Sequence, residues 1–302
     1  GCGGKAKFAG ARSSDLKAYT GAAESRAGKD VVVSMAMDST GKYLLYAATR
    51  DTKEGWGFNH GLELYSFNQE INIRLPLGKL GRSSTFGFLT LSKAPRPEMI
   101  AAIKTVDTDG NGDVDERDAN QLFVMAPDGL DEEPVSPNNG EDVVAMWGDP
   151  NGRLVYFAST EYWEGKRIPF GKKVEDVMGD GLIHAYAWDY ESKQLADLGK
   201  CEIFLGPSPD GGETACVPPE GTKDAGKIVV AFRSRDGKKT SRAVIESEKD
   251  STIYPLGNGR VAWTRVEAST TGKRATVWVL GPDGKPARVT SPSADSRILR
   301  TL

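Results

Sequence analysis

Short apolar segments, each followed by a polar turn rich in Gly, recur along the whole chain. In 61–70 (GLELYSFNQE) the apolar positions are Leu62, Leu64 and Phe67, and in 276–285 (TVWVLGPDGK) they include Val277 and Val279. Alternation with a period of two places apolar side chains on one face of an extended strand. Similar segments occur at 119–129 and 182–194. The pattern predicts many short strands, each with a buried face, joined by tight turns.

Two of these turn-and-strand elements form an internal repeat. Residues 38–50 read DSTGKYLLYAATR and residues 149–161 read DPNGRLVYFASTE. The matched pairs are Asp38 and Asp149, Gly41 and Gly152, Lys42 and Arg153, and Thr49 and Thr160. Weaker copies occur at 91–103, 209–217, 257–265 and 291–300. The repeat spacing is therefore about 50 residues, which is the length of a four-stranded propeller blade.

The fold class that this repeat predicts is all-β, a β-propeller of six four-stranded blades over residues 31–302. The last copy, Ser291–Leu302, supplies only about one strand of a blade. We therefore expect residues 1–30 to contribute to closure of the propeller, because pairing the terminal strands removes open sheet edges. Five blades with a capping strand are the alternative.

Composition agrees with strands and turns and narrows the classes of partner. The chain has 302 residues, 35 Gly and 16 Pro, with 39 Lys and Arg against 42 Asp and Glu, a net charge of −3. A slightly acidic chain without a long basic run argues against nucleic acid as a partner. Only two His argue against a multi-histidine zinc site. No apolar run reaches the ~18 residues of a membrane-spanning helix.

The repeat unit resembles a known family. The element S-x-D-G-K-x followed by three apolar residues, and then L-(Y/F)-apolar and another D-G turn, is similar to the TolB-like propeller repeat over residues 31–302. The resemblance implies a six-bladed propeller of the bacterial cell envelope. TolB has an extra α/β domain before its propeller, whereas about 30 polar residues precede the first blade here. The resemblance therefore does not imply a Tol–Pal role.

Residues 1–30 are expected to form a polar tether. The start Gly1-Cys2-Gly3-Gly4 resembles the cleavage region of a bacterial lipoprotein, in which the Cys is lipidated. This predicts lipidation of Cys2 and an exported protein in the periplasm, at the outer membrane or on the cell surface. A vector-derived remnant is the alternative origin of these residues.

The sharpest local motif is an EF-hand-type loop at 107–118 (DTDGNGDVDERD). Such loops place oxygen ligands at positions 1, 3, 5, 7, 9 and 12 and Gly at position 6, and hard oxygen ligands favour Ca²⁺. The predicted ligands are Asp107, Asp109, Asn111, Asp113, Asp115 and Asp118. The flanking segments indicate strands instead of the usual helices. An acidic loop that binds nothing is the alternative. A degenerate second loop contains Asp176 and Asp180, but has Met178 at position 3 and His184 at position 9.

Further candidate sites are weaker. Cys201 and Cys216 are spaced as if on adjacent strands, where they are expected to form a disulfide or to be buried as small apolar residues. Aromatic residues in long loops are candidate protein-partner contacts. These residues are Trp56, Phe58, Tyr162, Trp163 and Phe170.

Catalytic motifs are scarce in the sequence. It contains no G-x-S-x-G elbow, no P-loop and no G-x-G-x-x-G turn between a strand and a helix. We therefore expect a non-enzymatic propeller, stabilised by Ca²⁺, that acts as a binding or structural subunit with other envelope proteins. The alternatives are a calcium-dependent carbohydrate or cell-wall binder and a propeller hydrolase or lyase with carboxylates in the central funnel.

Overall fold

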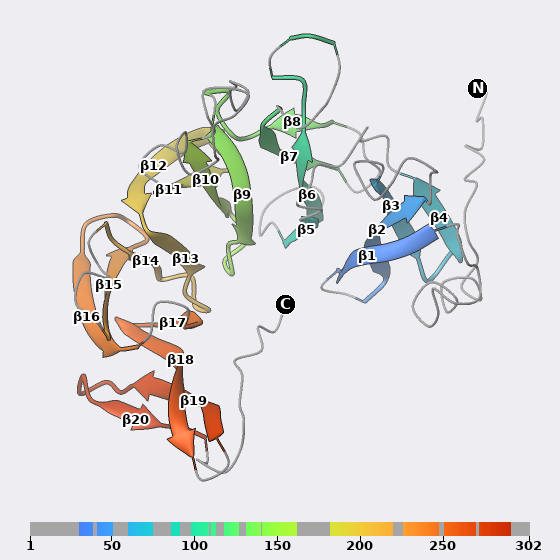
Figure 1. The fold of residues 1–302 in the computed structure, drawn as a ribbon. Coiled ribbons are helices and arrows are strands. Elements are labelled where there is room, and N and C mark those ends of the chain that lie inside the picture. The colour runs from blue at the N-terminus through green and yellow to red at the C-terminus, as the bar shows by residue number, and fades with distance from the viewer. Residues whose placement is uncertain are drawn as a thin grey trace, which may run out of the picture. The chain divides into compact units, whose positions relative to one another are not determined.

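The structure is a computed structural model, and it describes thirteen stretches of the chain. These are 30–38, 41–50, 60–74, 86–90, 98–108, 110–112, 118–126, 131–139, 141–161, 182–219, 226–247, 251–269 and 272–290. All regular structure in these stretches is β-strand (Figure 1). Within these stretches, no helix is long and apolar enough to span a membrane.

The described strands form five four-stranded sheets, and in each sheet hydrogen-bonded neighbours follow chain order. The first sheet is β1 (Asp30–Met37), β2 (Tyr43–Arg50), β3 (His60–Ser66) and β4 (Ile71–Arg74). The second is β5 (Phe86–Thr90), β6 (Glu98–Thr105), β7 (Asn120–Met125) and β8 (Glu133–Pro134). The third is β9 (Glu141–Gly148), β10 (Leu154–Glu161), β11 (Ile183–Asp189) and β12 (Gln194–Cys201).

The last two sheets follow the same plan. The fourth is β13 (Ile203–Pro207), β14 (Glu213–Val217), β15 (Lys227–Ser234) and β16 (Thr240–Glu246). The fifth is β17 (Ile253–Gly257), β18 (Arg260–Ser269), β19 (Gly272–Leu280) and β20 (Pro286–Arg288). Successive four-stranded meanders are the blades of a β-propeller, so the predicted fold class is confirmed. Residues 1–29 and 291–302, on which closure and a sixth blade depend, lie outside the described residues.

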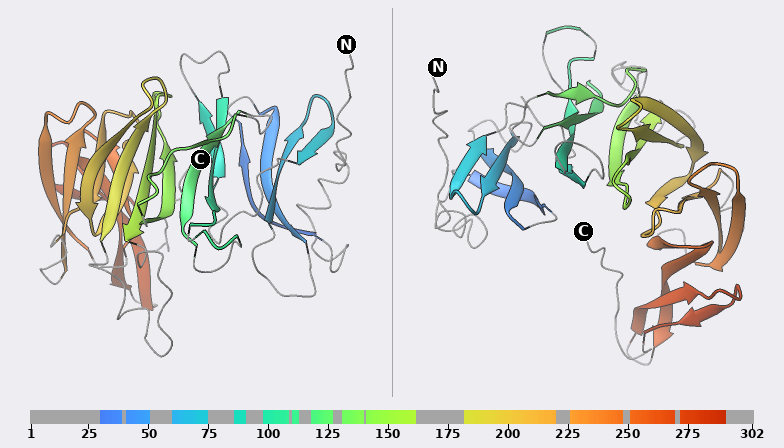
Figure 2. Two further views of the ribbon diagram at one scale, coloured as in Figure 1. Left: turned by 90° about the horizontal axis from the view of Figure 1, so that it is seen from above. Right: turned by 180° about the vertical axis from the view of Figure 1, so that it is seen from behind.

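The chain divides into two compact units. One contains residues 1–146 with 162–178, and the other contains 147–161 with 179–302. The first unit includes the sheets β1–β4 and β5–β8 (Figure 2). The second unit includes β10 to β20, which contribute all or most of the last three sheets.

The repeated turn has the same hydrogen bond in the first, third and fourth blades. Gly41 N–H donates to the Asp38 carbonyl at 3.1 Å, and Gly152 N–H to the Asp149 carbonyl at 2.8 Å. Gly211 N–H likewise donates to the Ser208 carbonyl at 2.8 Å. The three glycines have φ of +67°, +72° and +65°, a region that other residues adopt at a cost. The alignment of 38–50 with 149–161 and 209–217 is therefore a structural repeat.

Each unit has its own apolar core. In the first, Leu45, Leu64, Ile100, Phe123 and Met125 form one buried cluster. Strand β6 is buried on both faces, since Ile100 to Ile103 are all fully inaccessible to solvent. Phe67, predicted from the alternation to be buried, is 40% exposed. It lies one residue beyond β3, where its ring packs edge-on against that of Tyr65.

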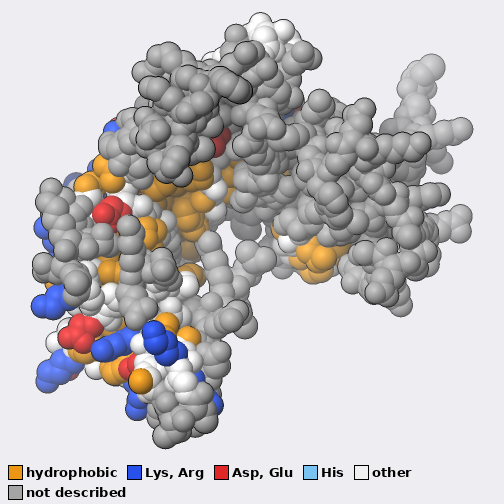
Figure 3. Space-filling model, viewed as in Figure 1, with side chains coloured by type: hydrophobic (Ala, Val, Ile, Leu, Met, Phe, Trp, Pro, Cys, Tyr) orange, Lys and Arg blue, Asp and Glu red, His pale blue; other side chains and the backbone are white. Residues whose placement is uncertain are grey.

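In the second unit, one cluster fills the space between the fourth and fifth sheets. It includes Phe232, Ile228 and Val230 of β15 with Val261 and Trp263 of β18. Lys and Arg side chains lie at the outer edges of β16, β19 and β20, with hydrophobic side chains between them (Figure 3). The core therefore sits between the sheets, as expected for packed blades.

Candidate functional site

The predicted calcium loop connects β6 to β7, so strands flank it as the sequence indicates. Its first residue, Asp107, organises the backbone that follows. Its Oδ1 accepts the N–H groups of Gly110 at 2.7 Å and Asn111 at 3.1 Å, and its Oδ2 accepts that of Gly112 at 2.8 Å. Gly112, the predicted turn glycine, has φ of +89°. A carboxylate has about four acceptor positions, so these three bonds leave capacity for a cation.

Asp118, the last predicted ligand, closes the loop. It is only 5% exposed, and its Oδ1 accepts the Thr108 N–H at 2.8 Å and the Thr108 hydroxyl at 3.2 Å. At the base, the Thr105 hydroxyl donates to Asn120 Oδ1 at 2.8 Å. The loop ends are thereby held together by contacts that involve no metal.

The remaining predicted sites cannot be placed. Asp109, Asp113 and Asp115 of the calcium loop, and Asp176 and Asp180 of the degenerate loop, lie outside the described residues. So do Cys2 and the five loop aromatics, Trp56, Phe58, Tyr162, Trp163 and Phe170. Within the described part of the chain, no three His, Cys, Asp or Glu side chains are grouped as metal ligands. The Ca²⁺ site therefore stays a prediction.

The predicted disulfide between Cys201 and Cys216 is not formed, because both are free thiols. The sequence placed them on adjacent strands, but a blade boundary intervenes. Cys201 ends β12 of the third sheet, and Cys216 lies in β14 of the fourth. Their side chains meet between the two sheets in one cluster with Phe204 and share a hydrogen bond. That bond raises the pKa of the Cys201 thiol, with burial adding to the increase.

A polar array in the third sheet escaped the sequence analysis, which considered His184 only as position 9 of the degenerate loop. His184 Nε2 lies 3.0 Å from Asp197 Oδ1, and its Nδ1 lies 2.8 Å from the Tyr186 hydroxyl. A carboxylate only accepts, so Nε2 carries a proton and, in the neutral ring, Nδ1 accepts from Tyr186. The array forms because Tyr186 pairs with Asp197 across β11 and β12. A His-x-Tyr pair on one strand face is the sequence signal that was missed.

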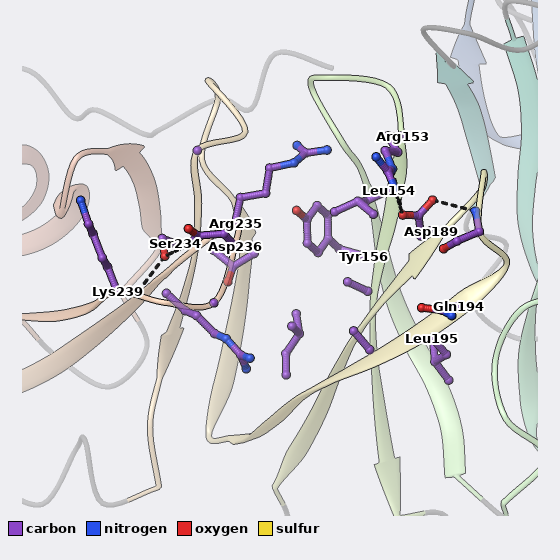
Figure 4. A pocket seen from close by; sticks show the side chains of 18 residues that line it. Arg153, Leu154, Tyr156, Asp189, Gln194, Leu195, Ser234, Arg235, Asp236 and Lys239 are labelled. Carbon is purple, nitrogen blue, oxygen red and sulfur yellow. Dashed lines mark hydrogen bonds and ion pairs between the residues drawn. The ribbon is translucent and has the colours of Figure 1, made fainter.

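A cavity with a volume of about 750 Å³ lies in the second unit, between the third and fourth sheets (Figure 4). Strands β10 to β12 form one wall, and β14, β15 and the turn before β16 form the other. Tyr156, Leu154 and Leu195 contribute to the first wall, and Arg233 and Arg235 to the second. The sequence did not predict this cavity, because its walls come from segments some 80 residues apart.

A buried ion pair borders the cavity. The Asp149 side chain is fully buried, and its two oxygens accept from the Arg235 guanidinium at 2.8 Å and 2.6 Å. The N–H groups of Asn151, Arg153 and Leu154 also donate to this carboxylate. Burial alone would raise the pKa of Asp149, but the bonds from Arg235 and the backbone outweigh it and lower the pKa. The carboxylate is thus held ionised at neutral pH.

Asp189 and Tyr156, which also line the cavity, have shifted pKa values. Arg153 pairs with Asp189, with Nε 2.8 Å and a terminal nitrogen 2.5 Å from Oδ2. That hydrogen bond lowers the pKa of Asp189. Burial, reinforced by the Asp149 charge, raises the pKa of Tyr156 to about 12. The Tyr156 hydroxyl is therefore a permanent donor at physiological pH.

Comparison with known proteins supports the fold. No protein-family model matches the chain, and no curated protein matches it. Among solved structures, the chain is similar to TolB from Acinetobacter baumannii, with 16% identity, 84% of this chain covered and a TM-score of 0.45. It is also similar to an oligogalacturonate lyase solved with manganese, with 12% identity, 83% of this chain covered and a TM-score of 0.50. A structure from a study of two prolyl endopeptidases gives 13% identity, 87% coverage of this chain and a TM-score of 0.51.

The chain spans 53% of the TolB chain, 65% of the lyase chain and 34% of the endopeptidase chain. At these identities the likeness shows the fold alone. The expectation of a non-enzymatic propeller, which rested on the scarcity of catalytic motifs, is contradicted, because a lyase and an endopeptidase have similar folds. Their similarity is no evidence of activity in this chain. The comparisons therefore establish the architecture and leave function to be argued from the residues.

Proposed function

We propose that this chain is a calcium-binding β-propeller that acts as a binding or structural subunit of a bacterial envelope or extracellular assembly. The observation that carries the proposal is the geometry of Asp107. Its carboxylate already orders the backbone at positions 4, 5 and 6 of the twelve-residue loop. Order at these three positions reduces the reorganisation that they need on receiving a cation, which favours binding.

The arrangement of charges supports Ca²⁺ as the occupant. The loop carries five carboxylates and one amide at the six predicted ligand positions, and Ca²⁺ takes six to eight oxygen ligands. Position 12 is Asp118 instead of the usual bidentate Glu, and it is buried. A shorter side chain at this position favours weaker binding, so we expect a Kd of about 0.1–1 mM, typical of extracellular calcium modules.

The cellular role rests on the sequence. The repeat resembles TolB-like propellers, and the Gly1-Cys2-Gly3-Gly4 start resembles a lipoprotein cleavage region. An exported propeller with a lipid on Cys2 would meet other envelope proteins at a membrane surface. Extracellular calcium concentrations would also occupy a site of the expected affinity. The partners that fit this role are therefore envelope proteins.

A calcium titration of thermal unfolding tests the proposal. At a calcium concentration 100-fold above Kd, the wild-type chain should gain about 2.7 kcal/mol of stability. Asp109→Ala removes a predicted ligand without touching the Asp107 hydrogen bonds and should abolish that gain. Asp131→Asn, in a neighbouring acidic turn at φ of +55°, is the matched control and should keep it. A gain that survives in Asp109→Ala would contradict the predicted site.

The envelope role needs a separate measurement. Cross-linking in intact bacterial cells that produce the tagged full-length chain should capture envelope proteins and, if Cys2 is lipidated, give a lipid mass on its peptide. Cys2→Ser should lose the lipid mass and the membrane association. Recovery of the wild-type chain only as an unlipidated, uncross-linked species would overturn the assembly role while leaving the calcium result standing.

A further inference from the structure

The two faces of strand β15 differ sharply in polarity. Val230 and Phe232 belong to the apolar cluster shared with the fifth sheet. The next residue, Arg233, belongs to the opposite face and pairs in register with Thr214 on one side and Thr240 on the other. This polar row faces the third sheet and lines the cavities there. Burying charged and hydroxyl groups between blades costs free energy unless they form hydrogen bonds or ion pairs.

Part of the facing wall on the third sheet consists of small or apolar side chains and leaves space. Tyr156, Ala187 and Ala196 are aligned across β10, β11 and β12. Two alanines in a row that packs against another sheet leave a gap that larger side chains would fill. The result is the 750 Å³ cavity, which lies within the size range of small-molecule sites.

Tyr156 presents its hydroxyl to this space. The residue is only 2% exposed, yet its hydroxyl has no hydrogen-bond partner among the residues that the structure describes. Figure 4 shows the hydroxyl directed across the cavity, towards the side that carries Arg235 and Asp236. A hydroxyl that faces the cavity without a partner from the described residues can donate to an acceptor supplied by a ligand.

The charges around the cavity leave one guanidinium without a counterion. Arg153 is paired with Asp189, and Arg235 with Asp149. Arg233 forms no ion pair with any residue in the described stretches. Its guanidinium lies over the turn at Gly237, where Nη2 is 3.2 Å from the position that a Cβ would take. The turn glycine thus makes room for a charged group at the cavity wall.

We propose that this cavity binds a small amphiphilic carboxylate. The carboxylate would accept from the Arg233 guanidinium and the Tyr156 hydroxyl, a charge-assisted arrangement that neither group finds within the described protein. The apolar body would lie against Leu154, Leu195 and Leu198, which line the same cavity. This site is independent of the calcium loop and of the proposed envelope role.

Isothermal titration with octanoate and with octanol tests the site on the full chain. Octanoate should bind, and octanol, which keeps the apolar body without the charge, should bind at least about tenfold more weakly. Arg233→Met should lower octanoate affinity by at least about tenfold, and Tyr156→Phe should lower it severalfold. Arg265→Met, on the exposed surface of the fifth sheet, is the matched control and should leave affinity unchanged.

A second variant separates loss of the site from loss of the fold. Ala187→Leu fills the cavity and should abolish octanoate binding while the unfolding temperature stays at or above that of the wild-type chain. Absence of octanoate binding at millimolar concentration would overturn the proposal. Equal affinity for octanol and octanoate, or undiminished octanoate binding by folded Arg233→Met or Ala187→Leu, would overturn it as well.

Discussion

Arg235 clamps the carboxylate of Asp149, 86 residues earlier in the chain, through two nitrogen–oxygen contacts of 2.8 Å and 2.6 Å. Asp149 begins the β9–β10 turn, and Arg235 lies in the turn between β15 and β16. The same carboxylate also accepts three backbone N–H groups of its own turn. One buried group therefore fixes a local turn and ties the third blade to the fourth.

Breaking this pair should be costly. Arg235→Met would leave the fully buried Asp149 carboxylate without its counterion, and the loss of stability should be about 3 kcal/mol. Arg265→Met breaks an ion pair whose Glu246 partner is 69% exposed and should cost under about 0.5 kcal/mol. Urea unfolding followed by circular dichroism measures both. Similar losses for the two variants would contradict a larger contribution of the buried pair to the free energy of unfolding.

The same carboxylate predicts acid sensitivity. Its pKa is lower in the folded protein than in the unfolded chain, so its stabilisation is complete above the unfolded value near 4. This contribution is lost as the pH falls from about 4 through the folded pKa. Asp149→Asn should be less stable at pH 7, but its stability should fall less steeply below pH 4. Parallel stability–pH curves for the two proteins would contradict this assignment.

Gly206 permits a close approach by an aromatic ring. It has φ of +86°, and a Cβ there would lie 2.8 Å from Cδ1 of Trp147, which also packs edge-on against Phe204. Gly226 has a similar φ of +80° but no heavy atom within 4 Å of the Cβ position. Gly226→Ala should cost about 1 kcal/mol from backbone strain, and Gly206→Ala a further 1–3 kcal/mol, roughly the cost of overpacking. Equal costs, measured by thermal unfolding, would contradict a role for the indole contact.

The two free thiols should react unequally. The hydrogen bond from Cys201 lowers the pKa of Cys216 more than burial raises it, and the Arg242 charge assists. Iodoacetamide should therefore modify Cys216 before the buried Cys201, as peptide mass mapping would show. Cys201→Ala removes the hydrogen bond and should slow the reaction at Cys216. Faster modification of Cys201 would contradict the prediction that Cys216 is the more reactive thiol.

The sequence predicted the elements that local chemistry determines. The repeated turn at Asp38 and Asp149 could be predicted from the sequence because its Gly and carboxylate lie within a few consecutive residues. The turn from Asp107 to Gly112 could be predicted for the same reason. The Tyr186–His184–Asp197 array and the cavity at Tyr156 were not, since both depend on strand register and on which sheet faces which. The spacing of Cys201 and Cys216 likewise did not reveal the blade boundary between them; their side chains meet there as free thiols.

The most direct test of the calcium-binding propeller is a count of bound metal. Native mass spectrometry of the full chain purified in calcium, before and after treatment with a chelator, should show one Ca²⁺ per chain that the chelator removes. Asp109→Ala should carry none, whereas Asp131→Asn should carry one. A wild-type chain that retains no Ca²⁺ at millimolar calcium would show that residues 107–118 form only an acidic turn.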